Sequence, residues 1–367
     1  MLNGQKRQLE AVLESIEDPY LGKNLLEAEV LSSFDWKENS LSIHLELPYP
    51  AEGTKSTLVS QLQEKAQQML EVTDVTVTIG MKIRPARIKE GIEPLRTVKN
   101  IIAVASGKGG VGKSTTSVNL ALALAKEGAK VGLLDADIYG PSLPLMMGVE
   151  KLPKAKEGEA LEPFEAHGVK GISIGLLVPK DEAVIWRGPV VIQALQQLLH
   201  QTNWGELDYL IMDLPPGTGD IQLTMVQKMP ISAAVIVTTP QDMALQDATR
   251  AVAMFNKTKL PVMGVIENMS SYVCSSCGHS EAIFGEGGGN TLVEKFDLEF
   301  LGDLPLNLQL RKDCDAGTPT VARDPDGAIA LIYRELARKV AAQLVKKASI
   351  KKARQTLNLT LKPMGKK

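Results

Sequence analysis

The hydrophobic positions of this chain follow two different patterns, which meet near residue 100. In the first part, apolar residues at 9–16 and 60–70 recur at the helical period. Alternate apolar residues at 41–47 and 75–79 indicate two half-buried strands. This pattern predicts a small α/β domain over residues 1–80.

Beyond residue 100, short and fully apolar runs alternate with segments of helical spacing. An uninterrupted apolar strand is typical of a sheet that is covered on both faces. Strands that alternate with helices predict right-handed crossovers and an α/β fold with a doubly wound, mostly parallel sheet, which binds ligands at the carboxyl ends of its strands. The expected strands are residues 101–105, 131–134, 209–212, 234–237, 262–266 and 300–301.

Between the two patterns lies a stretch with no clear apolar period. Residues 81–98 are basic and contain two prolines, so we interpret them as a linker. The sequence therefore predicts a small α/β domain at 1–80, a basic linker at 81–98, a large α/β domain at 99–345 and a basic tail at 346–367.

Composition adds limits to this picture. The chain has 367 residues, of which 44% are hydrophobic and 23% charged, as in ordinary globular proteins of two domains. It shows no secretory signal and no apolar stretch long enough to span a bilayer, so we expect a cytoplasmic location without stable membrane insertion. The net charge of −2 provides no general attraction to nucleic acid, and none is expected as a partner.

The basic tail is the exception to this neutral balance, because it carries seven lysines and Arg354. A run of this kind is typical of a solvated, frayed terminus. Local contact with a membrane or a nucleic acid is the alternative.

One glycine-rich segment, which follows the first strand of the large domain, predicts nucleotide binding. It matches the pattern Gly-x-x-x-x-Gly-Lys-Ser and opens a helix that we expect to end at Gly128. Its backbone N–H groups and the helix N-terminus are suited to bind phosphates. Lys113 is expected to reach the β- and γ-phosphates, and Ser114 to ligate Mg²⁺ beside Thr115. The residues of this phosphate loop are Gly107, Lys108, Gly109, Gly110, Val111, Gly112, Lys113 and Ser114.

Polar side chains stand at the ends of three other expected strands, where the same site would need them. Asp135 and Asp137 follow one strand, and Asp213 follows another as the magnesium-coordinating aspartate of a P-loop enzyme does. Helix or turn capping is the structural alternative for Asp213. Asn268 ends a further strand, where its amide could either read the edge of a nucleotide base or serve ordinary turn chemistry.

The three cysteines, at positions 274, 277 and 314, are too few for a disulfide framework. Cys274 and Cys277 form a Cys-x-x-Cys pair, and two chains related by a two-fold axis would supply four thiolates. An iron–sulfur cluster, a structural zinc ion, for which His279 is a further ligand, and a redox or inert pair all remain open on spacing alone. Cys314 has no partner in the sequence and is treated as incidental.

The second lysine of the phosphate loop, Lys108, resembles the deviant Walker A motif of the MinD/ParA and nitrogenase iron-protein superfamily. Within that superfamily, residues 95–345 resemble the Mrp/ApbC iron–sulfur cluster carriers. In the small domain, Asp18-Pro19-Tyr20-Leu21-Gly22 resembles iron–sulfur assembly factors, whose usual cysteine–proline pair is Tyr49-Pro50 here. The segments that carry the resemblance to the carriers are 135–142, Trp186-Arg187-Gly188-Pro189, 215–220 and 274–277.

This resemblance implies an ATPase that works as a homodimer. ATP is expected at the dimer interface, with Lys108 reaching the phosphates of the partner's nucleotide and Asp137 orienting the attacking water. Lys108, Lys113, Asp137 and Asp213 are thus the expected catalytic residues. A nucleotide site in one chain alone would lack the Lys108 that the second chain supplies, so hydrolysis is expected to depend on closure of the dimer.

The resemblance also implies a cargo. A labile 4Fe–4S cluster is expected to bridge two subunits through Cys274 and Cys277 and to be transferred to apoproteins, with cluster scaffold proteins as further partners. The alternative is a MinD- or ParA-like positioning ATPase that acts on a membrane or DNA. A nitrogenase-like electron donor is a third reading.

Overall fold

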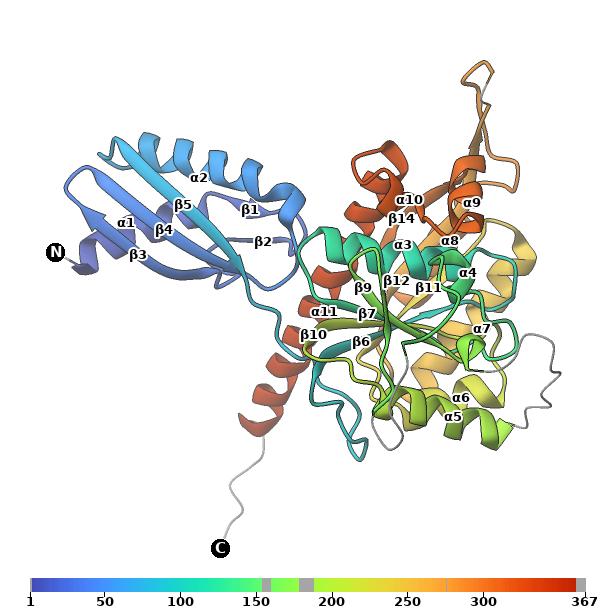
Figure 1. Ribbon diagram of the computed structural model, residues 1–367. Helices are drawn as coiled ribbons and strands as arrows, with labels where there is room; N and C mark the ends of the chain where they lie inside the picture. The colour runs from blue at the N-terminus through green and yellow to red at the C-terminus, as the bar shows by residue number, and fades with distance from the viewer. Residues whose placement is uncertain (1, 154–159, 178–187, 275, 361–367) are drawn as a thin grey trace, which may run out of the picture. The chain divides into compact units, whose positions relative to one another are not determined.

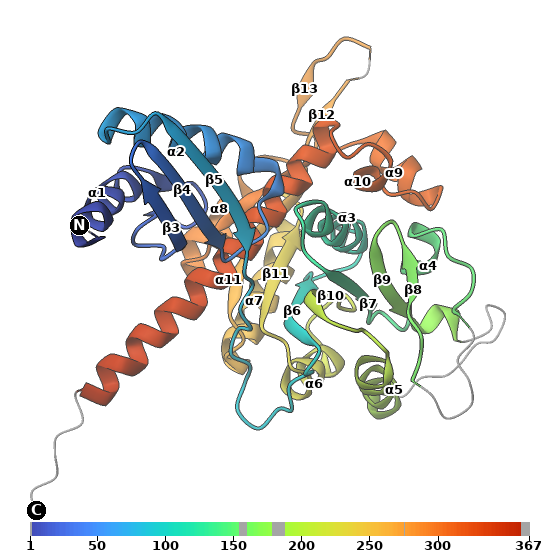
Figure 2. The same ribbon diagram turned by 60° about the vertical axis from the view of Figure 1, so that its left-hand side comes forward.

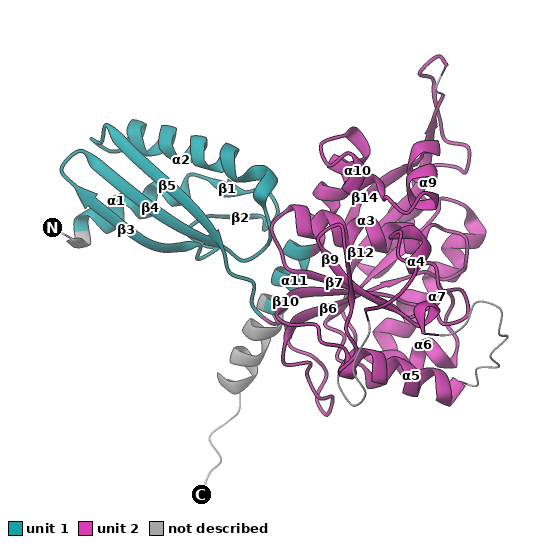
Figure 3. Cartoon of the chain, in the orientation of Figure 1, with its two compact units in different colours: residues 1–84, 341–367 teal, residues 85–340 magenta. Residues whose placement is uncertain are grey.

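The computed structural model describes residues 2–153, 160–177, 188–274 and 276–360, and its side chains from residue 4 to residue 348 within those ranges. Figure 3 shows that the chain forms two compact units. One comprises Met1–Arg84 with Ala341–Lys367, and the other comprises Pro85–Val340.

The first unit contains a three-stranded sheet in the order β3-β4-β5 (Figure 1). The central strand is antiparallel to β3 and parallel to β5, and the alternate apolar residues of β4 are buried as the sequence predicts. The sequence pattern does not predict β3, because its side chains are only half-buried or exposed and do not alternate strictly. The elements of this unit are α1 (Leu2–Glu14), β1 (Glu17–Asp18), β2 (Lys23–Asn24), β3 (Leu31–Lys37), β4 (Ser40–Leu47), η1 (Glu52–Thr54), α2 (Lys55–Met69) and β5 (Asp74–Met81).

Asp18, in the short hairpin of β1 and β2, is buried, and its carboxylate accepts several hydrogen bonds. The hydroxyl of Tyr49 donates to its Oδ2 at 2.6 Å, and the N–H groups of Tyr20 and Leu21 donate to its Oδ1 at 2.9 and 2.8 Å. Tyr49, in the Tyr49-Pro50 pair, therefore has a structural role in this unit through its buried hydrogen bond to Asp18.

The second unit is built on a nine-stranded sheet in the order β13-β12-β11-β6-β10-β7-β9-β8, with β14 paired to β12. Only β8 and β13 pair antiparallel, which confirms the mostly parallel sheet. The strands β8 and β9 were not predicted, because they are short and a lysine and a glycine interrupt the apolar run of β9. The strands are β6 (Val98–Ala105), β7 (Val131–Asp135), β8 (Phe164–Ala166), β9 (Val169–Ser173), β10 (Leu207–Asp213), β11 (Ala233–Thr238), β12 (Val262–Val273), β13 (Ser280–Glu281) and β14 (Phe300–Leu306).

Helices cover both faces of this sheet, which explains why every residue of β10 and β11 is buried. Figure 2 shows α5 and α6 on one face and α3 on the other, so the sheet is doubly wound. The helices are α3 (Lys113–Lys126), α4 (Leu143–Met146), η2 (Ile174–Leu176), α5 (Gly188–Gln201), α6 (Asp220–Lys228), α7 (Asp242–Thr258), α8 (Gly288–Phe296), α9 (Leu308–Asp315), α10 (Thr320–Arg323) and α11 (Ala328–Thr360).

The helix that follows the phosphate loop is fixed at its far end. Gly128 has φ +101°, which confirms the expected left-handed residue after α3. The buried carboxylate of Glu127 accepts hydrogen bonds from Arg334 Nε at 2.6 Å and Arg338 Nη1 at 2.8 Å. Along the described part of the chain, no helix is both long and apolar enough to cross a bilayer.

Candidate functional site

The phosphate loop joins the carboxyl end of β6 to the start of α3, as the sequence predicts. Gly110 and Gly112 have φ values of +83° and +80°, a left-handed conformation that an L side chain rarely adopts. A Cβ atom at Gly107 would overlap the backbone of Asp247 in α7, so this glycine is required by close packing. The loop is therefore shaped both by its own backbone and by a neighbouring helix.

Lys113, Ser114 and Asp213 converge directly behind the loop. The Nζ atom of Lys113 lies 2.8 Å from Asp213 Oδ1, and the Ser114 hydroxyl donates to Asp213 Oδ2 at 2.6 Å. The side chains of Lys113 and Asp213 are only 6% and 3% exposed, so both charges are held away from bulk water. A hydroxyl and a carboxylate are hard oxygen ligands, and their position side by side fits a magnesium ion.

Ser117 is a member of this cluster that was not identified from the sequence. Its hydroxyl donates to Asp213 Oδ1 at 2.6 Å and to the carbonyl of Lys113 at 3.0 Å. Ser117 lies three residues after Ser114, which places both hydroxyls on one face of α3. That helical spacing was the available signal, but only the sheet order brings Asp213 to this face.

Two further carboxylates lie at the carboxyl end of β7, which pairs with the strand of Asp213: Asp135 is the last residue of β7, and Asp137 follows it. Burial, then the nearby charge of Asp213, raises the pKa of Asp135 to about 7, although Ser173 and the Leu143 N–H donate hydrogen bonds to it. Asp137 is less buried, and desolvation raises its pKa above the ordinary value while the charge of Lys113 opposes the change. The Asp137 N–H donates to Asp135 Oδ1 at 3.2 Å, so Asp135 helps to orient the segment that carries Asp137.

Lys108 occupies the early part of the loop and is half-buried. Its carbonyl accepts a hydrogen bond from Ser106 Oγ at 2.8 Å. Within the residues that the structure describes, no carboxylate forms an ion pair with the Lys108 ammonium group. Thr115 also lies at the start of α3, and its carbonyl accepts from Asn119 Nδ2 at 3.0 Å.

Asn268 contacts the loop itself. Its Nδ2 atom donates to the carbonyl of Val111 at 2.8 Å, and the residue is only 6% exposed. A side chain at Gly112 would overlap this amide. The structure thus gives Asn268 a role in holding the phosphate loop, and its contact with a nucleotide base stays a prediction.

Cys274 and Cys277 lie on a hairpin that continues from β12 beyond the sheet to β13 (Figures 1 and 2). The Cys274 N–H donates to the carbonyl of His279, and the Gly278 N–H donates to the carbonyl of Cys274, both at 2.9 Å. Both thiols are free, with Cys274 half-buried and Cys277 exposed. Backbone N–H groups of Ser276 and Cys277 lower the pKa of Cys274, which favours the thiolate that binds metals. Ser275 lies outside the described residues.

The remaining cysteine has a different environment. Cys314 is buried in α9, and desolvation raises its pKa to about 11. Its sulfur lies 3.8 Å from Asn119 Nδ2. A neutral thiol of this kind is a structural side chain.

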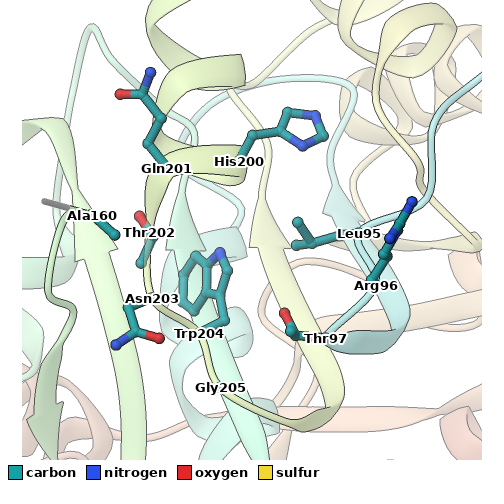
Figure 4. A pocket seen from close by; sticks show the side chains of 10 residues that line it. All are labelled: Leu95, Arg96, Thr97, Ala160, His200, Gln201, Thr202, Asn203, Trp204 and Gly205. Carbon is teal, nitrogen blue, oxygen red and sulfur yellow. The ribbon is translucent and has the colours of Figure 1, made fainter.

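Two other features do not join these residues. Trp186 and Arg187 lie outside the described part of the chain, whereas Gly188 and Pro189 begin α5. Figure 4 shows a pocket whose lining includes Trp204. Its lining comes largely from the segments before β6 and β10, at the amino ends of these strands, whereas the phosphate loop follows the carboxyl end of β6. The indole N–H of Trp204 already donates to the Leu199 carbonyl at 2.9 Å, and we assign the pocket no function.

Comparison with known sequences decides the family. The family model described as "NUBPL iron-transfer P-loop NTPase" matches residues 97–341. The chain belongs to this family. A second model, described as "Iron-sulfur cluster assembly protein", matches residues 6–79, within the first unit.

Curated proteins similar to this chain extend the match, in two of the three cases below, to nine tenths of its length. A protein of Salmonella typhimurium named iron–sulfur cluster carrier protein is 47% identical over 90% of each chain. One of the same name from Deinococcus radiodurans is 43% identical over 90% of this chain and 93% of its own. A protein of Arabidopsis thaliana named iron–sulfur protein required for NADH dehydrogenase, mitochondrial, is 47% identical over 68% of this chain and 80% of its own.

Solved structures agree with the fold of the second unit, which contains most of the residues matched by the NUBPL family model. A nucleotide-binding protein of Archaeoglobus fulgidus, solved in complex with ADP, is 39% identical, covers 64% of this chain and 91% of its own, and has a TM-score of 0.55. The cell division ATPase MinD of Pyrococcus furiosus is 22% identical, covers 66% of this chain and 98% of its own, and has a TM-score of 0.50. The second likeness concerns the fold alone.

Proposed function

We propose that this protein is an ATP-hydrolysing carrier that receives an iron–sulfur cluster on Cys274 and Cys277 and delivers it to apoproteins. The observation that carries the proposal is the hairpin, which presents two free thiols at its tip in the same unit as a complete phosphate loop. Relatives that align over nine tenths of this chain are named iron–sulfur cluster carrier proteins, which supports the choice of cargo.

The nucleotide site contains the groups that phosphoryl transfer to water requires. Lys113 is placed to neutralise charge on the γ-phosphate, and Ser114 and Asp213 would hold Mg²⁺, which supplies further positive charge to the phosphates. Asp137 is proposed to orient the attacking water. Lys108 is proposed to cross to the nucleotide of a second copy, and the absence of a described carboxylate beside it leaves its charge available.

A homodimer is proposed because large apolar side chains are exposed on segments that follow the carboxyl ends of parallel strands. Leu145 after β7 is 65% exposed, and Met243 after β11 is 67% exposed. Tyr139 is exposed on the same segment as Leu145, and Val190 in α5 and Leu308 after β14 are also exposed. A second copy that packs against this end of the sheet would cover such residues.

The two chains of this dimer would contribute four thiolates, the ligand set of a 4Fe–4S cluster. The cluster is cargo, so exposure of Cys277 is useful because an acceptor protein must reach the site. A zinc ion uses the same ligands, and metal analysis separates the two.

Cluster transfer tests the function directly. The full chain, reconstituted with iron and sulfide, should develop brown thiolate-to-iron absorption and restore activity to an apo iron–sulfur enzyme, at a rate that ATP changes. Cys274→Ala should lose both properties, while the matched change Cys314→Ala should retain them. Lack of transfer with and without ATP, or tight binding of zinc alone, would contradict the carrier function and leave the nucleotide site unaffected.

A further inference from the structure

The strand that leads to the cysteine hairpin, β12, changes from buried to more exposed where it passes the phosphate loop. The first part of β12, up to Asn268, is buried in the sheet, whereas its last five residues are half-buried or exposed. Between Asn268 and Tyr272 the register with β14 shifts, because four steps along β12 correspond to two steps from Leu304 to Leu306. The hairpin therefore begins at a break in the sheet that lies next to the loop.

Met269 forms this break. Its φ is +58°, a left-handed conformation that is unusual for a residue with a long side chain inside a strand. A residue is held in such a conformation only when its surroundings impose it, and positions of this kind are enriched in switch regions. At Met269 the surroundings are the phosphate loop on one side and β14 on the other.

Three side-chain contacts fix the base of the hairpin. Glu267 Oε2 accepts a hydrogen bond from the N–H of Gly289, where the returning chain enters α8. Asn268 Nδ2 donates to the Val111 carbonyl of the loop at 2.8 Å. Ser270 Oγ donates to Asp303 Oδ2 of β14 at 3.0 Å. Asn268 alone among them connects the hairpin to the nucleotide site.

Val111 and Gly112 immediately precede Lys113, so a change in the loop when phosphates bind acts on the carbonyl that Asn268 holds. The side chain of Asn268 also fills the space beside Gly112, so the loop and the amide cannot move independently. A buried and tightly packed contact of this kind transmits displacement, because packed interiors are not continuously deformable.

We propose that Asn268 is a positioning residue that couples the phosphate loop to the cysteine hairpin, with Met269 as the point about which the hairpin is re-oriented. Nucleotide binding then changes the orientation of Cys274 and Cys277 within one chain and thereby their affinity for a cluster. By reciprocity, binding of a cluster to these cysteines changes the affinity for nucleotide by the same factor. The inference rests on the proposed function only in taking these cysteines as the cluster site.

Alkylation of the metal-free full chain tests the coupling without any cluster. The rate at which iodoacetamide modifies Cys274 and Cys277 is followed by mass spectrometry, with no nucleotide and with a non-hydrolysed ATP analogue at a concentration shown to saturate each variant. We expect saturation to change the wild-type rate about fivefold or more. Asn268→Ala should abolish that change, whereas Asn203→Ala, the same substitution at the opposite end of the sheet, should retain it.

Two further measurements make the result decisive. Glycine adopts the left-handed conformation without strain, so we expect Met269→Gly to fold, and the variant keeps the Asn268 amide. It should reduce the effect of nucleotide on the alkylation rate, because the backbone at position 269 is then less restrained. A change within one chain is independent of protein concentration, whereas protection by a second copy increases with it. An effect that grows with concentration, that persists in Asn268→Ala, or that is absent from the nucleotide-saturated wild type overturns the proposal. Failure of the chain to load iron would overturn the carrier function and leave this result standing.

Discussion

The two lysines of the phosphate loop belong to one motif and are proposed to serve different chains. Lys113 is buried against Asp213 in its own chain, whereas Lys108 has no described carboxylate partner and lies earlier in the loop. We propose on this basis that Lys113 serves nucleotide binding and that Lys108 serves hydrolysis.

Substitution of the two lysines should therefore give distinct results. Lys113→Ala removes a charge-assisted contact to the phosphates, and we expect nucleotide affinity to fall by about tenfold or more. Lys108→Ala should keep affinity near the wild-type value and lower kcat by about a thousandfold, as loss of a cation supplied in trans does. Binding of a fluorescent ATP analogue and steady-state phosphate release measure the two effects. Full turnover in Lys108→Ala would contradict the shared site.

The three thiols should differ in their rate of alkylation, because each has a different local environment. With its pKa raised to about 11 by burial, Cys314 carries only about one thiolate per thousand molecules at pH 8. Because the thiolate is the reactive form, its alkylation should be slow at pH 8 and should rise about tenfold per pH unit below pH 11. Peptide mapping after brief alkylation should find Cys274 and Cys277 modified before Cys314. Equal labelling of Cys314 in the folded protein at pH 7.5 would show that it is not buried.

At the scale of elements, the phosphate loop depends on its neighbours as much as on its own glycines. Gly107 packs against the backbone of α7, and α3 is held at its far end by arginines from α11. The position of Lys113 is thus set by contacts that are distant in the sequence.

A methyl group at two positions of the loop should separate packing from loop chemistry. Gly107→Ala forces a displacement of the loop or of α7, and we expect it to lower the free energy of unfolding by about 2 kcal/mol. At Gly109 the nearest atom to an added Cβ is Pro216 Cγ at 3.9 Å, an ordinary contact, so Gly109→Ala should cost less than about 1 kcal/mol. Urea unfolding of both variants gives the comparison, and equal losses would rule out the packing argument.

The buried carboxylate at the end of α3 allows a second test of this kind. Glu127→Ala removes the buried carboxylate between Arg334 and Arg338 and leaves these arginines only more exposed carboxylates such as Asp326 and Glu335, and we expect a loss of about 3 kcal/mol in the free energy of unfolding. Asp315→Ala breaks the exposed pair with Arg311 and should cost less than about 1 kcal/mol. Thermal unfolding distinguishes them. A small effect at Glu127 would mean that the arginines find other partners.

At the scale of the whole molecule, the proposed function requires two copies. We propose that two copies pair through the exposed apolar residues at the carboxyl end of the sheet, so that the cysteine pair of each chain contributes to one cluster site. The assignment of residues 346–367 as a solvated basic tail stays a prediction.

A charge placed in the proposed interface should prevent this assembly. Met243 is 67% exposed after β11, and Met243→Glu should shift the nucleotide-bound protein from dimer to monomer. Met69, in the first unit and 46% exposed, provides the matched control Met69→Glu, which should dimerise normally. Light scattering with a non-hydrolysed ATP analogue reads the outcome. Dimers in both variants would place the interface elsewhere.

Sequence patterns alone determined much of this protein. The apolar runs identified β6, β7, β10, β11, β12 and β14, and the glycine spacing located the phosphate loop, because periodicity and turn chemistry are local properties of a chain. The short or irregular strands β1, β2, β3, β8, β9 and β13 lacked such a period and were missed.

Tertiary structure decided which distant residues meet. Ser117 reaches Asp213 across the neighbouring strands, Asn268 holds the carbonyl of Val111, and Gly107 packs on α7. Each contact joins residues roughly a hundred or more positions apart, so it depends on strand order and helix packing rather than on any local pattern. The sequence therefore identified the chemical groups, and the fold determined that the phosphate loop contacts Asn268 at the base of the cysteine hairpin.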